Sequence, residues 1–320
     1  MRGEERLWLP VVLDGRKSGI YDLGDLPVRS NYPALLRENA MSLGTALITG
    51  ASGGIGAAYA QRLARRGYDL ALVGRNRSRL NTLAAHVSDE TGREVQVLAA
   101  DLSDRKALAG LESFLNEDAS LSMLVNSAGI GAVAPLLQSD VAKMEEMITL
   151  NVSVVIRLIY AAAPGFVARG KGTIINISST VAIGPETLNG VYAGTKAFVL
   201  ALSQSLHHEL SGKGIRVQAV LPGPTLTEFW NVAGMPVHSL PSEIVMPLGE
   251  MVDAALAGLE LGEFATIPSL PHIADWDAFE AARQTLLLNL SHAHPAARYR
   301  KQSDKQQLPS HDGNSGKRHQ

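Results

Sequence analysis

The chain has 320 residues, and its 29 Lys and Arg nearly balance its 31 Asp and Glu, which argues against a nucleic-acid-binding protein with a strongly basic surface. Hydrophobic residues make up 46% of the sequence and charged residues 19%, which provides a large core and excludes a disordered chain. The absence of cysteine excludes disulfides, thiolate metal sites and cysteine nucleophiles, and we predict no metal site of another kind.

The first 41 residues are rich in Arg, Asp, Pro and Gly and show no sustained hydrophobic period. Two interpretations stay open. Either Met41 is the true start of translation and residues 1–40 are an upstream extension, or this segment is an arm that packs on the domain or on a partner. The apolar run at 7–13 leads into Asp14 instead of a small-residue cleavage site, so we expect no signal peptide. No stretch approaches ~18 uninterrupted apolar residues, so we expect no membrane-spanning helix and a cytoplasmic protein.

From residue 44 short apolar runs alternate with segments of helical period. We predict strands at 45–49, 69–73, 94–98, 121–125, 173–177, 215–220 and 264–267. We predict helices at 55–66, 77–91, after Asp104, and at 140–169, 190–210, 242–261 and 275–288. The alternation indicates βαβ units, and hence an α/β fold with a doubly wound, mostly parallel sheet of about seven strands and helices on both faces. We place this single domain at 42–290 and expect residues 291–320 to form a polar, disordered tail.

The first predicted strand runs into a glycine-rich turn, Thr49-Gly-Ala-Ser-Gly-Gly-Ile-Gly56, which leads directly into a helix. A dinucleotide pyrophosphate binds at this place in a doubly wound sheet, because glycines let the backbone approach the phosphates and the helix start offers unpaired N–H groups. An ordinary glycine-rich connection is the alternative. We predict cofactor contacts at Gly50, Ser52, Gly53, Gly54, Ile55 and Gly56.

At this turn the chain resembles the short-chain dehydrogenase/reductase family, whose TGxxxGxG element matches Gly50, Gly54 and Gly56. The resemblance implies a Rossmann fold that binds a nicotinamide cofactor. It also implies hydride transfer between C4 of the nicotinamide and a carbonyl or secondary alcohol.

Two further segments match elements of the same family. Asp101-Leu102, just past the third predicted strand, resembles the acidic contact to adenine. The segment Asn126-Ser-Ala128-Gly129 ends the fourth strand and resembles the NNAG element, with Ser where Asn is commoner. The resemblance implies that Asn126 braces the sheet, and that Ala128 and Gly129 leave room for the cofactor.

The end of the second predicted strand bears on the choice between NAD and NADP. An acidic side chain there accepts a hydrogen bond from the ribose 2′-OH of NAD, whereas an Arg accommodates the 2′-phosphate of NADP. The strand ends in Gly-Arg75-Asn76-Arg77, with no carboxylate at that end. We therefore predict NADP(H) over NAD(H), bound beside Arg75 and Asn76. One departure counts against this prediction, because the glycine turn has Gly53 where NADP-preferring members of the family often carry a basic residue. The alternative is that Arg75 and Arg77 are solvated loop charges.

A Tyr-x-x-x-Lys pair, Tyr192 and Lys196, lies near the start of a predicted helix and places both side chains on one face. A phenol titrates near 10, and both a neighbouring ammonium and the positive nicotinamide ring of an oxidised cofactor are expected to lower its pKa toward general acid/base use. With Ser179, 13 residues before the tyrosine, and Asn151, the pair resembles the family's catalytic tetrad. The resemblance implies that Ser179 polarises the substrate oxygen, that Lys196 binds the nicotinamide ribose, and that Asn151 kinks its helix and anchors a proton-relay water. Ser178 is the less favoured hydroxyl.

The segment Pro222-Gly223-Pro-Thr225 follows the sixth predicted strand and resembles the family's PG element. We expect Thr225, assisted by Thr227, to contact the nicotinamide carboxamide. The loop at 225–245 is expected to line a pocket for a largely apolar carbonyl or alcohol compound, although core packing explains its apolar residues equally well. These residues are Leu226, Phe229, Trp230, Val232, Met235 and Val237.

Three rival functions are weighed against an NADP-dependent oxidoreductase. A ketoacyl-carrier-protein reductase is expected to end soon after the seventh strand. A cofactor-sensing regulator without catalysis is expected to lack the Tyr or the Lys, and an epimerase or dehydratase needs a larger C-terminal substrate domain. Family resemblance also predicts a homodimer or homotetramer that associates through the helices at 140–169 and 190–210.

Overall fold

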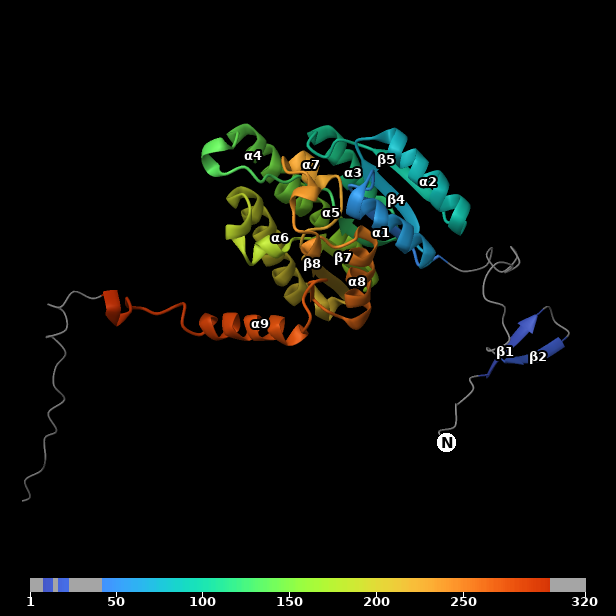
Figure 1. Ribbon diagram of the computed structural model, residues 1–320. Coiled ribbons are helices and arrows are strands. Elements are labelled where there is room, and N and C mark those ends of the chain that lie inside the picture. Colours follow the sequence, from blue (N-terminus) through green and yellow to red (C-terminus); the bar gives the residue numbers. More distant parts are fainter. Residues whose placement is uncertain (1–7, 14–16, 23–41, 300–320) are drawn as a thin grey trace, which may run out of the picture. The chain divides into compact units, whose positions relative to one another are not determined.

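The computed structural model describes residues 8–13, 17–22 and 42–299, and the chain divides into two compact units, Met1–Pro268 and Ser269–Gln320. The described part of the first unit contains a sheet of seven parallel strands in the order β5-β4-β3-β6-β7-β8-β9 (Figure 1). Their bounds are β3 (Thr45–Thr49), β4 (Asp69–Gly74), β5 (Val95–Ala99), β6 (Leu121–Asn126), β7 (Gly172–Ile177), β8 (Ile215–Val220) and β9 (Ala265–Thr266). The predicted α/β fold with a doubly wound sheet is confirmed.

The strand order reverses at β3. The chain runs outward through β4 and β5, and then returns to pair β6 with the other edge of β3. In open α/β sheets a crevice forms outside the carboxyl ends of the strands at such a reversal, and ligands bind there. The glycine turn after β3 and the segment after β6 both lie at this point in the sheet.

Helices cover both faces of the sheet. Alternate residues of β3 point to opposite faces: Ala46 and Ile48 join the core with α1, α2 and α8, while Leu47 joins the core with α3, α5 and the end of α6. All three are fully buried, which explains why the strand is a continuous apolar run in the sequence. The bounds are α1 (Gly54–Arg65), α2 (Arg77–Thr91), α3 (Arg105–Glu117), α4 (Val141–Ile148), α5 (Val154–Arg169), α6 (Gly190–Leu210), α7 (Phe229–Ala233) and α8 (Leu248–Leu261).

Two predicted helices differ from the structure. The helix expected at 140–169 is interrupted by a π-helical turn at Thr149–Ser153, which separates α4 from α5. The helix expected at 242–261 begins only at Leu248, after Pro247 and a 3-10 turn at Ser242–Ile244. Proline disfavours the helical conformation of the residue before it, and Met246 instead forms an isolated β-bridge with Thr225.

The α4–α5 segment, Val141–Arg169, is long and apolar enough to cross a membrane by length and composition. The sequence led us to expect no membrane-spanning helix, because the apolar residues of this segment are not in one uninterrupted run. In the structure α5 packs on the sheet, with Leu158, Ile159 and Phe166 almost fully buried. A core helix that covers a parallel sheet passes the same test of length and composition.

Two strands, one helix and one 3-10 turn among the described residues do not belong to the seven-stranded sheet and its covering helices. Strands β1 (Trp8–Leu13) and β2 (Lys17–Asp22) pair antiparallel, in a region where the sequence showed no sustained period. The second unit contains α9 (Ile273–Leu287), which was predicted at 275–288, and a 3-10 turn at Ala297–Tyr299. The other expectations for residues 1–41 and for 300–320 lie outside the described residues.

Candidate active site

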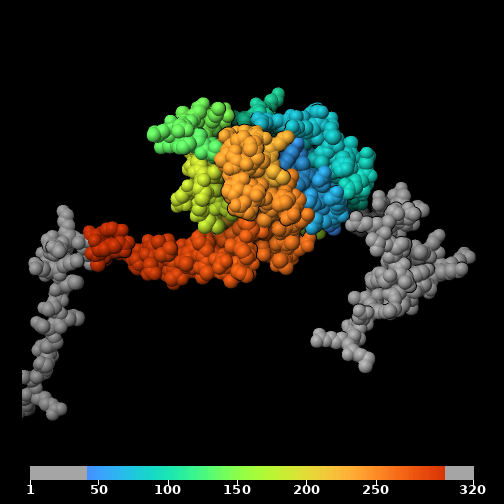
Figure 2. Space-filling model, viewed as in Figure 1, coloured from blue at the N-terminus to red at the C-terminus, as the bar shows by residue number. Residues whose placement is uncertain are grey.

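A cavity of about 650 Å³ lies among the segments that follow β3, β4, β5, β6, β7 and β8. Its wall includes the glycine turn, the start of α6 and the segment after β8. In Figure 2 the orange surface that follows β8 lies between the green surface of α4 and the blue surface at the start of α1. The cavity therefore occupies the crevice that the strand reversal creates.

The glycine turn has the backbone that the sequence requires. Gly50 and Gly54 have φ values of +70° and +52°, which side-chain-bearing residues rarely adopt. A Cβ on Gly56 would lie 2.6 Å from the Gly50 carbonyl oxygen, so this glycine lets α1 begin close to the turn. No side chain caps the start of α1, and its first residues, Gly54 and Ile55, line the cavity. The turn is therefore a cradle suited to an anion.

The structure brings most of the predicted cofactor residues to the cavity wall, but not Gly56, Asn76 or Asn126. Gly56 packs behind the turn, and the Asn76 side chain instead caps α2 by accepting a hydrogen bond from the Arg79 N–H at 3.0 Å. The predicted residues that line the cavity are Gly50, Ser52, Gly53, Gly54, Ile55, Arg75, Asp101, Leu102, Ala128, Gly129, Tyr192, Lys196, Pro222, Gly223, Thr225 and Thr227.

A buried polar network fixes the ends of the central strands. Asn126 donates to Asn176 Oδ1 at 2.9 Å, and Asn176 donates to Ser203 of α6 at 2.9 Å, which ties β6 to β7 and to the helix. Thr49 Oγ1 accepts hydrogen bonds at 3.0 Å from the N–H groups of Ser127 and Ala128. No separate role was predicted for Thr49. Its signal in the sequence was its place as the first residue of the TGxxxGxG element.

Asn151 lies in the π-helical turn and is almost fully buried. Its side chain accepts from the Ile130 N–H at 3.0 Å, and it donates to the Ile130 carbonyl at 2.9 Å and to Thr195 Oγ1 at 3.1 Å. The irregular turn thus aims an amide at the segment after β6 and at α6. Asn151 does not itself line the cavity; a Cβ on Gly129, which does, would lie 3.1 Å from its Oδ1.

Tyr192 lies in the first turn of α6 and its side chain lines the cavity. The helix start is fixed by Asn189, whose Oδ1 accepts from the N–H groups of Val191 at 2.9 Å and Tyr192 at 3.3 Å. Ser179, at the end of β7, is within hydrogen-bonding reach of the phenol. The neighbouring Ser178 hydroxyl instead donates to the Lys196 carbonyl at 2.8 Å. The capping role of Asn189 was not predicted from the sequence, although Asn directly before a helix is a common capping residue.

The electrostatics of the pair differ from the sequence-based expectation. Burial raises the pKa of Tyr192 to about 12, and the hydrogen bond with Ser179 lowers it only in part. Burial also lowers the pKa of Lys196 to about 8. Lys196 Nζ donates to the Ile177 carbonyl at 2.8 Å and lies 5.8 Å from the centre of the Tyr192 ring. Lys196 therefore does not lower the phenol pKa in this structure, because desolvation dominates. The lowering expected from an oxidised nicotinamide ring stays a prediction.

At the end of the cavity beyond β4 and β5, Arg75 and Asp101 line the wall, and the Asp101 carboxylate accepts from the Ser103 N–H at 2.9 Å. A carboxylate also reaches this end from far along the chain. Glu228, in the segment after β8, pairs with Arg79 of α2 at 2.7 Å. The sequence-based prediction considered only residues near the end of β4, so it did not take Glu228 into account.

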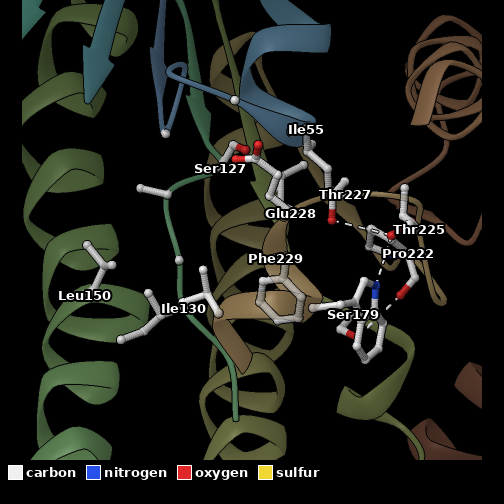
Figure 3. A pocket seen from close by; sticks show the side chains of 18 of the residues that line it. Ile55, Ser127, Ile130, Leu150, Ser179, Pro222, Thr225, Thr227, Glu228 and Phe229 are labelled. Carbon is white, nitrogen blue, oxygen red and sulfur yellow. Dashed lines mark hydrogen bonds between the residues drawn. The ribbon is translucent and has the colours of Figure 1, made fainter. Parts of the chain in front are cut away.

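The segment after β8 supplies the apolar wall of the cavity. Figure 3 shows the Phe229 ring pointing into the pocket, and its centre lies 5.7 Å from that of Tyr192. The ring packs so closely on Gly131 that a Cβ there would overlap it. Trp230 Nε1 donates to the Thr225 carbonyl at 2.9 Å and holds the segment in place. Of the residues expected in this loop, Phe229, Trp230 and Val232 line the cavity, together with Leu240 and Ile244, whereas Leu226, Met235 and Val237 do not.

Comparison with known proteins identifies the family to which this chain belongs. A sequence model described as short chain dehydrogenase matches residues 44–235, which contain the glycine turn, the Tyr–Lys pair and most of the cavity wall. The chain belongs to the short-chain dehydrogenase family. The resemblance found in the sequence motifs is therefore confirmed.

Three proteins similar to this chain are especially informative. A short-chain dehydrogenase from Sphingobium yanoikuyae in complex with NADPH is 50% identical, with a TM-score of 0.78 over 81% of this chain and 100% of that chain. A bulky-bulky ketone specific alcohol dehydrogenase from Comamonas testosteroni is 43% identical, with a TM-score of 0.75 over 81% of this chain and 99% of that one. A very-long-chain 3-oxoacyl-CoA reductase from Anas platyrhynchos is 37% identical over 55% of this chain, which spans 58% of that protein's length.

Proposed function

We propose that the protein is an NADP(H)-dependent oxidoreductase that interconverts a bulky, largely apolar ketone and its secondary alcohol, with Tyr192 as the proton-transferring group. The observation that carries the proposal is that Tyr192 and Ser179 line the same cavity as the glycine turn. One cavity therefore has room for a nucleotide bound at the glycine turn and for a carbonyl compound beside the Tyr192 phenol.

The residues of the cavity fit an NADP cofactor. The uncapped start of α1 and the open backbone of Gly50 and Gly54 suit the pyrophosphate. Arg75 is exposed, lines the cavity and makes no ion pair within the described part of the chain, so its guanidinium is available to a 2′-phosphate. Lys196 would hold the nicotinamide ribose and Thr225 the carboxamide. The relative from Sphingobium yanoikuyae in complex with NADPH supports this choice of cofactor.

The chain's own residues supply the proton chemistry. When bound, the cofactor supplies the hydride that reduces a carbonyl carbon or accepts one from an alcohol. In reduction Tyr192 donates its proton to the carbonyl oxygen and Ser179 donates a hydrogen bond to the same oxygen, which completes the C–OH group. A phenol with a pKa of about 12 carries its proton at neutral pH, which suits this direction. Lys196, with a pKa of about 8, exchanges protons near neutral pH, and Asn151 braces the segment beside it.

The substrate class follows from the apolar wall around Tyr192. Phe229, Trp230, Leu188 and Val181 present apolar surface to the cavity, while Ser179 and Tyr192 are placed to bind one oxygen. Such a pocket favours a carbonyl between two large apolar groups. The 43% identical alcohol dehydrogenase specific for bulky-bulky ketones supports this class.

The proposal is tested by following NADPH absorbance with a panel of ketones that differ in the size of the groups on each side of the carbonyl. We expect oxidation of NADPH with diaryl or aryl-alkyl ketones, and much slower turnover of acetone-sized ketones. A panel in which no carbonyl compound oxidises NADPH would contradict the proposal.

A second candidate is the reduction of 3-oxoacyl thioesters, favoured by the 37% identity to very-long-chain 3-oxoacyl-CoA reductase. The same assay decides between the two when acyl-CoA and acyl-carrier-protein thioesters join the panel. Preference for a thioester over every bulky ketone would replace the first candidate with the second.

The choice of cofactor gives a testable prediction at Arg75. Arg75→Ala removes the exposed guanidinium at the adenosine end of the cavity, so the preference for the 2′-phosphate should weaken. We expect the ratio of kcat/KM for NADPH over NADH to fall by about tenfold or more, because a charge-assisted hydrogen bond to phosphate is lost. An unchanged ratio in steady-state kinetics with both cofactors would exclude Arg75 as the determinant.

The substrate wall gives a prediction at Phe229. Phe229→Ala removes the ring beside Tyr192, so we expect the ratio of kcat/KM for a diaryl ketone over a small methyl ketone to rise by roughly tenfold. Val232→Ala is the matched control: Val232 lines the cavity but is 72% exposed, and its loss should leave the ratio unchanged. Equal changes in the two variants would mean that Phe229 does not limit substrate size.

A further inference from the structure

The adenosine end of the cavity carries two guanidinium groups. Arg75 directly follows β4, and Arg79 lies in the first turn of α2. Both residues line the cavity. A Cβ built on Gly53 of the glycine turn would have open space except for Arg79 Nη1 at 3.8 Å. The Arg79 side chain therefore reaches back from α2 to the glycine turn, where the backbone is open to an anion.

Glu228 forms an ion pair with this Arg79 guanidinium. Its Oε2 accepts from Arg79 Nη1 at 2.7 Å and its Oε1 from Arg79 Nη2 at 3.5 Å. The side chains of both partners are more than half exposed, at 55% and 72%, and an ion pair so exposed to solvent is weak. A phosphate dianion carries more charge than a carboxylate and also pairs with a guanidinium through two hydrogen bonds, so it can compete for Arg79.

We propose that Arg79 is a second specificity-determining residue for the 2′-phosphate of the cofactor, and that Glu228 restrains it by competing for the same guanidinium. The inference rests on the proposed function, since it concerns the NADP(H) that the cavity is proposed to bind. Arg75 and Arg79 together place two positive charges beside one dianion, while Glu228 places a negative charge there. The selectivity for NADP(H) is thus set by the balance of three side chains.

The pair also connects the two ends of the cavity. Glu228 directly precedes α7, and its carbonyl accepts from the N–H groups of Asn231 at 3.1 Å and Val232 at 3.4 Å. The next residue is Phe229, whose ring packs beside Tyr192. A 2′-phosphate that takes Arg79 releases the Glu228 side chain, which is attached to the helix that forms the substrate wall.

The test measures binding of nucleotide fragments to the full chain by isothermal titration calorimetry. Adenosine 2′,5′-bisphosphate and adenosine 5′-monophosphate differ only in the 2′-phosphate, so the ratio of their affinities isolates this contact. The variants are Arg79→Gln and Glu228→Gln. Arg77→Gln is the matched control, because Arg77 begins the same helix and carries the same charge but does not line the cavity.

We expect Arg79→Gln to weaken the bisphosphate by about tenfold and to change the monophosphate by less than about twofold. Glu228→Gln should strengthen the bisphosphate by roughly threefold or more, because it removes both the competitor and the repulsion. Arg77→Gln should leave the affinities for the bisphosphate and the monophosphate unchanged. Thermal unfolding of each variant identifies any general loss of structure.

Two outcomes overturn the inference. One is an Arg79→Gln variant that retains the preference for the bisphosphate, and the other is an equal loss of both nucleotides, which would make the ion pair merely structural. A different outcome marks the failure of the proposed function itself: a wild-type chain that shows no preference for the bisphosphate over the monophosphate.

Discussion

Replacing Tyr192 with Phe is expected to lower kcat for ketone reduction by about a thousandfold while NADPH still binds. The phenol is the proposed proton donor in the cavity, and positioned proton transfer contributes roughly 10²–10⁴ in rate. The substitution keeps the ring that packs against Phe229 at 5.7 Å, so the wall of the cavity stays in place. It removes one hydroxyl next to Ser179, which costs only about 1 kcal/mol of stability.

The measurement pairs steady-state kinetics with NADPH binding followed by fluorescence. Tyr59→Phe is the matched control, since Tyr59 is fully buried in α1 and its hydroxyl has no hydrogen-bond partner within the described structure. It loses the same atom at a place remote from the cavity, and we expect unchanged kcat and equal or higher stability. A Tyr192→Phe variant with kcat near that of the wild type would remove Tyr192 from the mechanism.

Replacing Lys196 with Met is expected to lower kcat while it raises the free energy of unfolding. We expect kcat to fall by roughly a hundredfold or more, because the ammonium that exchanges protons beside Tyr192 is lost. Burial lowers the pKa of Lys196 to about 8, which corresponds to roughly 3 kcal/mol of unfavourable desolvation at neutral pH. Loss of the hydrogen bond to the Ile177 carbonyl offsets about 1–2 kcal/mol of this. The variant should therefore be about 1–2 kcal/mol more stable at pH 7.

The pH dependence of this gain has a defined sign. Between pH 8 and the usual lysine pKa of about 10.4, the unfolded wild-type chain holds a proton at Lys196 that the folded chain has released. Wild-type stability therefore rises with pH across this window, while the Met variant lacks the effect. Its advantage should be largest below pH 8 and shrink toward pH 10.4.

Urea unfolding at several pH values measures this difference. Lys213→Met is the control, because Lys213 is exposed in the 3-10 turn that follows α6. It should alter neither kcat nor the pH profile. A Lys196→Met variant that is less stable than the wild type at pH 7, or whose advantage grows with pH, would contradict the desolvation argument.

Several features of the fold and the site follow from local sequence. The apolar run of β3 and the glycines after it are contiguous in the chain, so their order alone predicted a buried strand, a tight turn and a helix. The four-residue spacing of Tyr192 and Lys196 likewise places them on one face of α6. Helix bounds such as Arg77–Thr91 and Gly190–Leu210 were predicted from hydrophobic periodicity, which reports the side of a helix that will be buried.

Other features could not be obtained in this way because their causes are far apart in the chain. Glu228 meets Arg79 across 149 residues, and no pattern near either residue indicates the pair. The side chain of Asn151, in the π-helical turn, forms hydrogen bonds with Ile130 and Thr195, which only the assembled fold brings together. The Phe229 ring fits against Gly131 for the same reason.

By itself, the sequence determined the doubly wound sheet, the family, the position of the glycine turn and the four residues of the proposed tetrad. Only the tertiary structure decided how these groups titrate and which distant side chains oppose them. The sequence predicted that Lys196 would lower the pKa of Tyr192, whereas burial raises it to about 12. The physical reason is that spacing along a helix fixes which side chains are neighbours, but desolvation and long-range ion pairs depend on every atom that the fold packs around them.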